Sequence, residues 1–222
     1  MARRKVDRAG GGSGGWRVLE FDPTLRAAQA GDEEAFARLW RQFQPGLLRY
    51  LRVKAGPMAE DLASDVWTRV VGALCSFDGD EPQFGAWLYT TARHRVTDWY
   101  RSRYRTAEAL GLSGVADVVA KERVEHEVEA RSATDTALAM IAQLPPAQAE
   151  AVMLRVVAGL DVPRVARVMG RSPGAVRVLC HRGLKHLERR LREQAPGAEP
   201  EAAGMAEGAK PADSAPTRLE SA

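Results

Sequence analysis

The feature that most constrains this sequence is the spacing of its apolar residues, which recur every three or four positions through two long segments. Over residues 24–105 and 134–194 this spacing predicts helices nearly everywhere, and no stretch shows the clean apolar-polar alternation of a half-buried strand. We therefore expect an all-α fold. The expected helices in the first segment run from Pro23 to Arg52, from Met58 to Cys75 and from Gln83 to Arg105.

Local signals mark several helix ends. Asp32 is suited to cap a helix that carries Phe36, and the Pro45-Gly46 pair is a place where the first helix can break. Pro57 precedes the second helix, and Pro145-Pro146 should interrupt the helices of the second segment.

Composition divides the chain into two small helical domains, residues 23–105 and 133–194. Residues 1–22 combine a basic cluster with a Gly/Ser run, and residues 195–222 are rich in Ala, Pro, Gly and Glu. Such compositions bury too little apolar surface to order themselves, so we expect a flexible N-terminal arm and a disordered C-terminal tail. The acidic segment 106–132 should be a flexible linker, with some helical propensity in "AKERVEHEVEARS".

Positive charge is concentrated in the second domain. Residues 133–194 contain ten Lys and Arg against five Asp and Glu, whereas the whole chain has a formal net charge of only +3. No apolar run approaches the ~18 residues of a membrane-spanning helix, and the start does not resemble a signal peptide. Two cysteines do not make a disulfide framework. These features predict a cytoplasmic protein whose second domain binds nucleic acid.

The segment "VARVMGRSPGAVRVLCHRGLKHL", residues 165–187, has the pattern of a helix-turn-helix. Two tightly crossed helices need a small residue in the first helix, a glycine able to adopt positive φ at the turn, and apolar residues between them. Ala166, Gly170 and Val176 meet these needs, while Val165, Met169 and Leu179 can fill the wedge.

Ser172 is a good N-cap and Pro173 suits the first position of the second helix. Since the N-terminal part of a recognition helix meets base edges, we expect Gly174, Ala175, Arg177 and Val178 near bases. Arg171, His181, Arg182 and Lys185 should lie nearer the phosphates. The alternative is a helical hairpin with a solvated charged face, which the basic charge of the domain disfavours.

Residues 84–105, "FGAWLYTTARHRVTDWYRSRYR", interleave aromatic and arginine side chains. Aromatic faces that stack unpaired bases, beside guanidinium groups that follow phosphates, are typical of a surface that binds single strands. Trp87, Leu88, Ala92, Val96 and Trp99 have helical spacing and are expected to be mostly core. Tyr89, Arg93, Arg95, Tyr100 and the terminal arginines remain as candidates for contacts with DNA. The residue types alone do not decide between a surface that binds single strands and a helix whose aromatic residues are only structural.

The segment "EDLASDVWTRVVGAL" places Leu62, Val66, Val70 and Leu74 on one helical stripe. Asp61 and Asp65 lie one turn apart on another face, with Trp67 expected to be exposed nearby. Paired acids beside an exposed aromatic can dock a basic partner surface. Compensation of the helix dipole is an alternative for Asp61 but not for Asp65, which lies too far along the helix.

These three pieces, in this order and separated by a linker, resemble an extracytoplasmic-function sigma factor of the bacterial sigma-70 family. The resemblance covers residues 24–105, similar to sigma domain two, and 134–192, similar to sigma domain four. Departures include His94 where the family usually has Asn, Leu179-Cys180 for Arg-Leu, and Gly183 for Ala, so Leu179 should pack inward.

The resemblance implies partners and site residues. The partners are the polymerase core, through the β′ clamp helices and the β flap, promoter DNA, and a possible anti-sigma factor. Core binding would involve Asp61, Leu62, Asp65, Val66, Trp67 and Arg69. Capture of the −10 element would involve Phe77, Asp78, Phe84, Trp87, Tyr89, Arg93, His94, Arg95, Tyr100 and Arg101. Reading of the −35 element would involve Arg171, Ser172, Pro173, Gly174, Ala175, Arg177, Val178, His181, Arg182 and Lys185.

Two other functions are weighed against this one. A helix-turn-helix regulator that is not a polymerase subunit would explain the second domain but leave the first unused. An enzyme would need a site, and the four histidines and two cysteines show no zinc-ligand spacing, while no phosphate loop or nucleophile elbow is present. We therefore expect no enzymatic activity, no cofactor and no metal, with Cys75 and Cys180 as small core residues.

Overall fold

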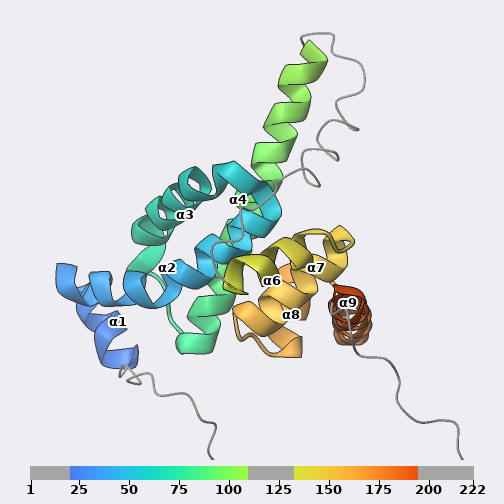
Figure 1. Cartoon of the computed structure of the whole chain (residues 1–222). Helices are drawn as coiled ribbons and strands as arrows, with labels where there is room; N and C mark the ends of the chain where they lie inside the picture. Colours follow the sequence, from blue (N-terminus) through green and yellow to red (C-terminus); the bar gives the residue numbers. More distant parts are fainter. Residues whose placement is uncertain (1–20, 110–132, 195–222) are drawn as a thin grey trace, which may run out of the picture.

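The computed structural model describes residues 21–109 and 133–194, and within these ranges every regular element is helical (Figure 1). The expected linker helix, residues 1–20 and residues 195–222 lie outside the described residues. The described ends of the arm and of the linker are helical rather than flexible, since Phe21 and Asp22 begin α1 and residues 106–109 continue α4. The helices are α1 (Phe21–Gln29), α2 (Glu33–Ala55), the 3-10 turn η1 (Gly56–Met58), α3 (Ala59–Leu74), α4 (Glu81–Ala109), α6 (Ala133–Ala142), α7 (Pro146–Val152), the π-helical turn η2 (Met153–Val157), α8 (Val162–Met169) and α9 (Pro173–Gln194).

The expected helix from Pro23 to Arg52 is two helices, α1 and α2. Gly31 separates them with a φ of 93°, a conformation that side chains other than glycine rarely adopt. Asp32 then caps α2 as predicted, because its carboxylate accepts a hydrogen bond from the Ala35 N–H at 2.9 Å.

The break expected at Pro45-Gly46 does not occur, and α2 runs through both residues. The reason for a glycine here is packing: a Cβ on Gly46 would lie 2.7 Å from the Tyr89 hydroxyl oxygen. Gly46 therefore lets α4 approach α2 closely enough to bury Tyr89.

Helices α1 to α4 form an N-terminal bundle around one core. The predicted stripe of α3 is confirmed, since Leu62, Val66, Val70 and Leu74 are all buried. Burying four such side chains removes a large apolar area from water, which is the main force that holds α3 against its neighbours.

Helices α6 to α9 form a C-terminal bundle. The break at Pro145-Pro146 is confirmed: α6 ends at Ala142 and α7 begins at Pro146. In η2 the Ala158 N–H donates to the Met153 carbonyl at 2.9 Å, the wider spacing of a π-turn. The Arg155 guanidinium donates a hydrogen bond to the Leu160 carbonyl oxygen, with an N···O distance of 3.1 Å, and the Leu160 side chain is buried.

The two bundles pack against each other along α2 and α4. Helix α4 contacts α8, and α2 contacts α6, α7 and η2. Figure 1 shows α6 to α8 beside α2 and the N-terminal part of α4, while the C-terminal part of α4 extends beyond the body of the molecule. Among the described residues no helix is long and apolar enough to cross a membrane.

Candidate nucleic-acid interface

The helix-turn-helix is formed by α8, the turn at Gly170 and α9. Gly170 adopts the left-handed conformation at φ 62° and ψ 42°, and the Arg171 N–H donates to the Ala166 carbonyl at 2.9 Å. This bond satisfies a carbonyl at the end of α8. Val165, Ala166, Met169 and Val176 are buried, and Leu179 is half-buried against the same core, so the predicted wedge and the inward packing of Leu179 are confirmed.

The start of α9 also follows the prediction. The Ser172 hydroxyl accepts a hydrogen bond from the Ala175 N–H at 3.2 Å, and Pro173 is the first helical residue. Val176 and Gly183 face the core, seven residues apart, and a Cβ on Gly183 would lie 2.8 Å from a methyl group of Val152. Glycine at this position therefore allows the close approach of α9 to α7.

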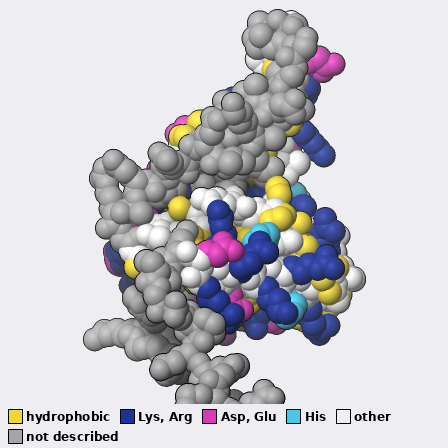
Figure 2. Space-filling model, turned by 45° about the vertical axis from the view of Figure 1, so that its right-hand side comes forward, with side chains coloured by type: hydrophobic (Ala, Val, Ile, Leu, Met, Phe, Trp, Pro, Cys, Tyr) yellow, Lys and Arg dark blue, Asp and Glu magenta, His cyan; other side chains and the backbone are white. Residues whose placement is uncertain are grey.

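The opposite face of α9 carries the predicted −35 contacts. All of them except Ala175 are exposed, and Ala175 is half-buried: the exposed set is Arg171, Ser172, Pro173, Gly174, Arg177, Val178, His181, Arg182 and Lys185. Figure 2 shows Lys, Arg and His side chains gathered on this side of the molecule. An exposed basic face opposite a buried one is the arrangement that a helix needs to enter a major groove.

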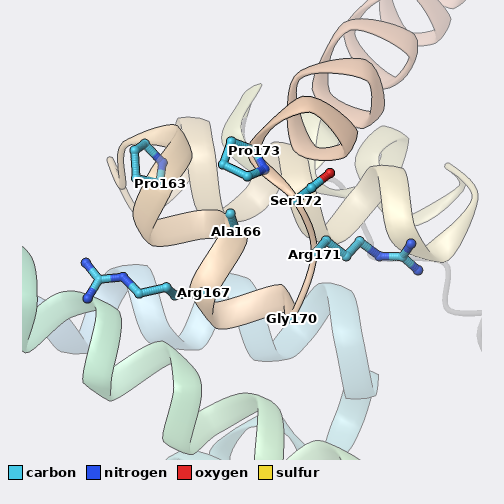
Figure 3. Close-up of a pocket in the computed structure, with 7 residues that line it drawn as sticks. All are labelled: Pro163, Ala166, Arg167, Gly170, Arg171, Ser172 and Pro173. Atoms are coloured by element: carbon cyan, nitrogen blue, oxygen red, sulfur yellow. The ribbon is translucent and has the colours of Figure 1, made fainter.

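An open pocket of about 460 Å³ adjoins this face, between α8 and the start of α9. Its lining consists of Pro163, Ala166, Arg167, Gly170, Arg171, Ser172 and Pro173 (Figure 3). The Arg167 and Arg171 side chains extend to opposite sides of the turn. Sequence reasoning missed Arg167, although its place between buried Ala166 and Val168 already indicated an outward side chain.

The predicted −10 aromatic residues divide into a buried group and a half-buried group. Phe84 is fully buried, at 0% exposure, among the rings of Phe21, Phe43, Phe77 and Trp87. Phe77 and Trp87 are half-buried and stacked, with ring centroids 5.0 Å apart, and Asp78 beside them is exposed. Phe84 therefore supports the half-buried rings of Phe77 and Trp87 and is itself covered, which contradicts its predicted contact with DNA.

The prediction that Tyr89 lies outside the core and contacts DNA is wrong. Tyr89 is 3% exposed and packs edge-on against Tyr50 at 5.4 Å between ring centroids, and burial raises the pKa of its hydroxyl. Trp99, expected to be mostly core, is half-buried with the Arg103 guanidinium 5.2 Å from its ring centroid. Tyr100 donates to the Lys54 carbonyl at 2.8 Å.

The cations of α4 are in different situations. His94 and Arg101 are exposed, whereas Arg95 pairs with Asp65 and Arg93 pairs with Glu150. The structure thus joins a residue predicted to bind DNA, Arg95, with one predicted to bind the polymerase, Asp65.

Of the predicted core-binding residues, Asp61, Asp65 and Arg69 are exposed, while Leu62, Val66 and Trp67 are buried. The prediction that Trp67 is exposed beside the acids is wrong. Trp67 is only 6% exposed, and its indole N–H donates to the Gln44 amide oxygen at 2.7 Å. Of these six residues, the acidic pair and Arg69 are accessible to a partner in this arrangement, because the side chains of the other three point into the N-terminal bundle.

Glu150 is the polar residue that sequence reasoning missed altogether. Its side chain is buried on α7, where Oε2 accepts from the Lys54 ammonium at 3.1 Å. Oε1 accepts from Arg93 Nε at 3.0 Å and from the Tyr50 hydroxyl at 3.2 Å. These partners are 57 to 100 positions away in sequence, so no local pattern identifies them.

The cysteines differ from each other. Cys75 is exposed, which contradicts the expectation of a core residue, because it follows the last residue of α3. Cys180 is half-buried, and burial raises the pKa of its thiol. Within the described residues no group of three His, Cys, Asp or Glu side chains is arranged to hold a metal ion.

Comparison with known families gives two matches in chain order. Residues 39–106 match Sigma-70 region 2, and residues 135–187 match Sigma-70 region 4. The chain belongs to the sigma-70 family. Region 2 covers most of α2 through α4, and region 4 covers α6 through most of α9.

Individual relatives place the chain among the extracytoplasmic-function, or ECF, sigma factors. It is 35% identical to the ECF RNA polymerase sigma factor BldN of Streptomyces coelicolor over 182 residues, which is 81% of this chain and 67% of that protein. It is 32% identical to the ECF RNA polymerase sigma factor SigD of Mycobacterium tuberculosis over 178 residues, covering 76% and 82% of the two chains.

Solved structures agree on the fold. CnrH, in complex with the cytosolic domain of CnrY, superposes with a TM-score of 0.54 at 22% identity over 78% of this chain and 97% of that one. The sigma factor RpoE of Bartonella quintana, in complex with the anti-sigma factor NepR, superposes with a TM-score of 0.55 at 19% identity, covering 71% and 96%. The family matches and the curated relatives, rather than these structures, show that the chain is an ECF sigma factor, a class whose members are in general not enzymes.

Proposed function

We propose that this sigma factor binds bacterial RNA polymerase core and directs it to promoters by reading two DNA elements with two different helices. The single observation that best supports this is the presence, on one chain, of an exposed basic helix-turn-helix and a separate helix that combines half-exposed aromatic rings with arginines. A protein that only binds duplex DNA needs the first of these and not the second.

In this proposal α9 reads the −35 element as duplex. Arg177 and Val178, in the exposed N-terminal half of α9, face base edges, while Arg171, Arg182 and Lys185 meet phosphates. The Ser172 hydroxyl caps α9 and the Gly170 N–H caps α8, so the entry of α9 is fixed and the basic face is already formed before DNA arrives.

Helix α4 and the loop before it capture the −10 element as a single strand. The stacked rings of Phe77 and Trp87 offer a face for an unpaired base, and His94, Arg93, Arg95 and Arg101 follow the backbone. Unstacking costs a few kcal/mol per step, and stacking of freed bases on these rings offsets that cost without ATP.

Helix α3 docks on the polymerase through Asp61, Asp65 and Arg69. Their side chains are exposed on one side of α3 while the opposite side is core, so α3 presents a charged surface on a rigid support. The β′ clamp helices are the partner that this family resemblance implies, and the β flap is the partner of region 4. By the same resemblance we propose a cytoplasmic location, association with the nucleoid when bound to polymerase, control by an anti-sigma factor, and no catalytic site on this chain.

The docking assignment is tested by replacing the acidic pair. Asp61→Ala with Asp65→Ala should weaken association with purified core polymerase by about tenfold or more, because paired charges at an interface contribute a few kcal/mol. Association is measured by fluorescence anisotropy of labelled protein titrated with core, and duplex binding by α9 should be unchanged. Glu34→Ala, which removes an exposed acid of α2 that pairs with Arg41, is the matched control.

If the double variant binds core as tightly as the parent does, α3 is not the docking helix. The remaining alternative is that the chain is a duplex-binding regulator and not a polymerase subunit. In that case neither the parent nor the double variant should associate measurably with core polymerase.

A further inference from the structure

A side chain of α1 holds the loop that joins α3 to α4, residues 75–80. Gln29 is the last residue of α1, and its side-chain nitrogen donates to the Leu74 carbonyl at 3.0 Å and to the Phe77 carbonyl at 2.7 Å. A primary amide has two N–H donors, so these two bonds use both of them. The partners are 45 and 48 positions away in sequence, and Gln29 therefore ties the loop to a distant part of the bundle.

Gln29 is itself well supported. Its α1 neighbours Leu25 and Ala28 are buried, and α1 packs against α2. The turn after α1 is closed by the Asp32 N–H, which donates to the Ala27 carbonyl at 3.0 Å. The two hydrogen bonds from Gln29 therefore attach the loop to a packed helix.

The residue that Gln29 holds is the one whose ring we assign to an unpaired base. The Phe77 N–H donates to the Leu74 carbonyl at 3.0 Å while its carbonyl accepts from Gln29, so both backbone groups of Phe77 are bonded. Its ring stacks on Trp87 with 5.0 Å between the centroids and 21° between the ring planes. The position of the Phe77 backbone determines whether the two rings can stack in this way.

The other end of the loop is fixed locally. The Gln83 N–H donates to the Asp80 carboxylate at 2.8 Å, and the Asp80 N–H donates to the Gln83 side-chain oxygen at 2.7 Å, which is a reciprocal cap at the start of α4. A Cβ on Gly79 would lie 2.7 Å from that same oxygen, so the backbone passes close to the cap. The Phe77 carbonyl lies outside this cap and is bonded by Gln29 instead.

The two bonds of Gln29 differ in what they do. The bond to Leu74 satisfies the carbonyl of the last residue of α3, a contact that any helix end can use. The bond to Phe77 lies beyond the end of α3 and fixes a residue that is only half-buried. Its main effect is therefore on the position of the Phe77 ring and not on the core.

We propose that Gln29 is a positioning residue for capture of the −10 element: it holds Phe77 stacked on Trp87, so that an unpaired base meets an aromatic face that is already formed. The proposal rests on the function proposed for α4 and the loop before it. A surface that is ordered in the free protein avoids the cost of ordering it on binding. Loss of the Gln29 donors should therefore weaken single-strand binding and leave the duplex-reading face of α9 unchanged.

The test compares Gln29→Met with the parent, using the full chain. Methionine is unbranched and uncharged like glutamine, but its side chain has no N–H donor. We expect faster hydrogen exchange over residues 75–80 by mass spectrometry. Anisotropy with a short fluorescein-labelled single strand of mixed sequence should show roughly three- to tenfold weaker binding, with the affinity for a labelled duplex unchanged. Gln143→Met, at an exposed position just after α6, should change none of these quantities.

A double-mutant cycle separates positioning from a general loss of structure. In the Phe77→Ala background the effect of Gln29→Met on single-strand binding should nearly vanish, because no ring is left to position. Gln29→Asn keeps the amide but shortens the side chain by one methylene, and it should behave like Gln29→Met. It covers the case in which the methionine disturbs the fold.

Parental hydrogen exchange over residues 75–80 in both variants overturns the proposal. Faster exchange with parental single-strand affinity also overturns it, and so does a loss of affinity that Phe77→Ala does not diminish. Failure of the proposed function gives a different result: the parent chain itself binds no single strand, although Gln29→Met still speeds exchange in the loop. The role of Gln29 in base capture is then overturned with it.

Discussion

Helices α4 and α9 both carry the cations that our proposal directs at promoter DNA, but the two helices hold them differently. Arg177, Arg182 and Lys185 of α9 are exposed and form no ion pair with any residue that the structure describes. Arg93 and Arg95 of α4 each contact a carboxylate, of Glu150 and Asp65 respectively. In the proposed function α9 therefore meets duplex DNA with exposed cations, whereas α4 must exchange protein carboxylates for phosphates.

The same contrast holds for the apolar residues. The outward face of α9 does not pack against the core, because Val176 and Gly183 on the opposite side of the helix make those contacts. On α4, Phe84 is core while Phe77 and Trp87, in contact with it, are half-exposed. Substitutions on α4 should therefore alter stability and binding together, and those on the outward face of α9 should alter binding alone.

The largest expected effect follows from Phe84→Ala. Removing a fully buried ring should lower the free energy of unfolding by about 3–5 kcal/mol, which urea denaturation followed by circular dichroism measures. Trp87→Ala, at the half-exposed neighbour, should cost clearly less stability while weakening single-strand binding. If Phe84→Ala costs no more stability than Trp87→Ala, the division of these rings into support and contact is wrong.

A smaller effect, on binding alone, is expected from Arg177→Ala. Loss of a base contact should weaken binding to duplexes that the parent protein selects from a random pool by about 1–3 kcal/mol, measured by anisotropy. The free energy of unfolding should stay within about 0.5 kcal/mol of the parent, because the side chain is exposed. Arg41→Ala on α2 serves as the control, and equal binding by both variants would remove Arg177 from the recognition face.

The parts that sequence reasoning predicted are those that local chemistry determines. The cap at Asp32, the turn at Gly170 and the cap at Ser172 each depend on residues within five positions, and all three are confirmed. The buried stripe of α3 follows from helical periodicity alone.

The parts that it missed depend on distant partners. Tyr89 was left as a candidate for DNA because it lies outside the set of apolar residues assigned to the core by their helical spacing, but the space beside Gly46 accepts its ring. Trp67 was expected outward beside the acids, but Gln44 satisfies its indole N–H inside the bundle. Glu150 shows no local signal at all, since its role exists only when the two bundles meet.

The function proposed for this chain is to make bacterial polymerase core start transcription at a DNA sequence that the chain itself recognises. Run-off transcription tests it with purified core and a template that carries a duplex sequence selected by the parent protein. We expect a discrete transcript that requires the chain and is lost when Asp61 and Asp65 are replaced by Ala. Persistent duplex binding with no chain-dependent transcript would contradict it.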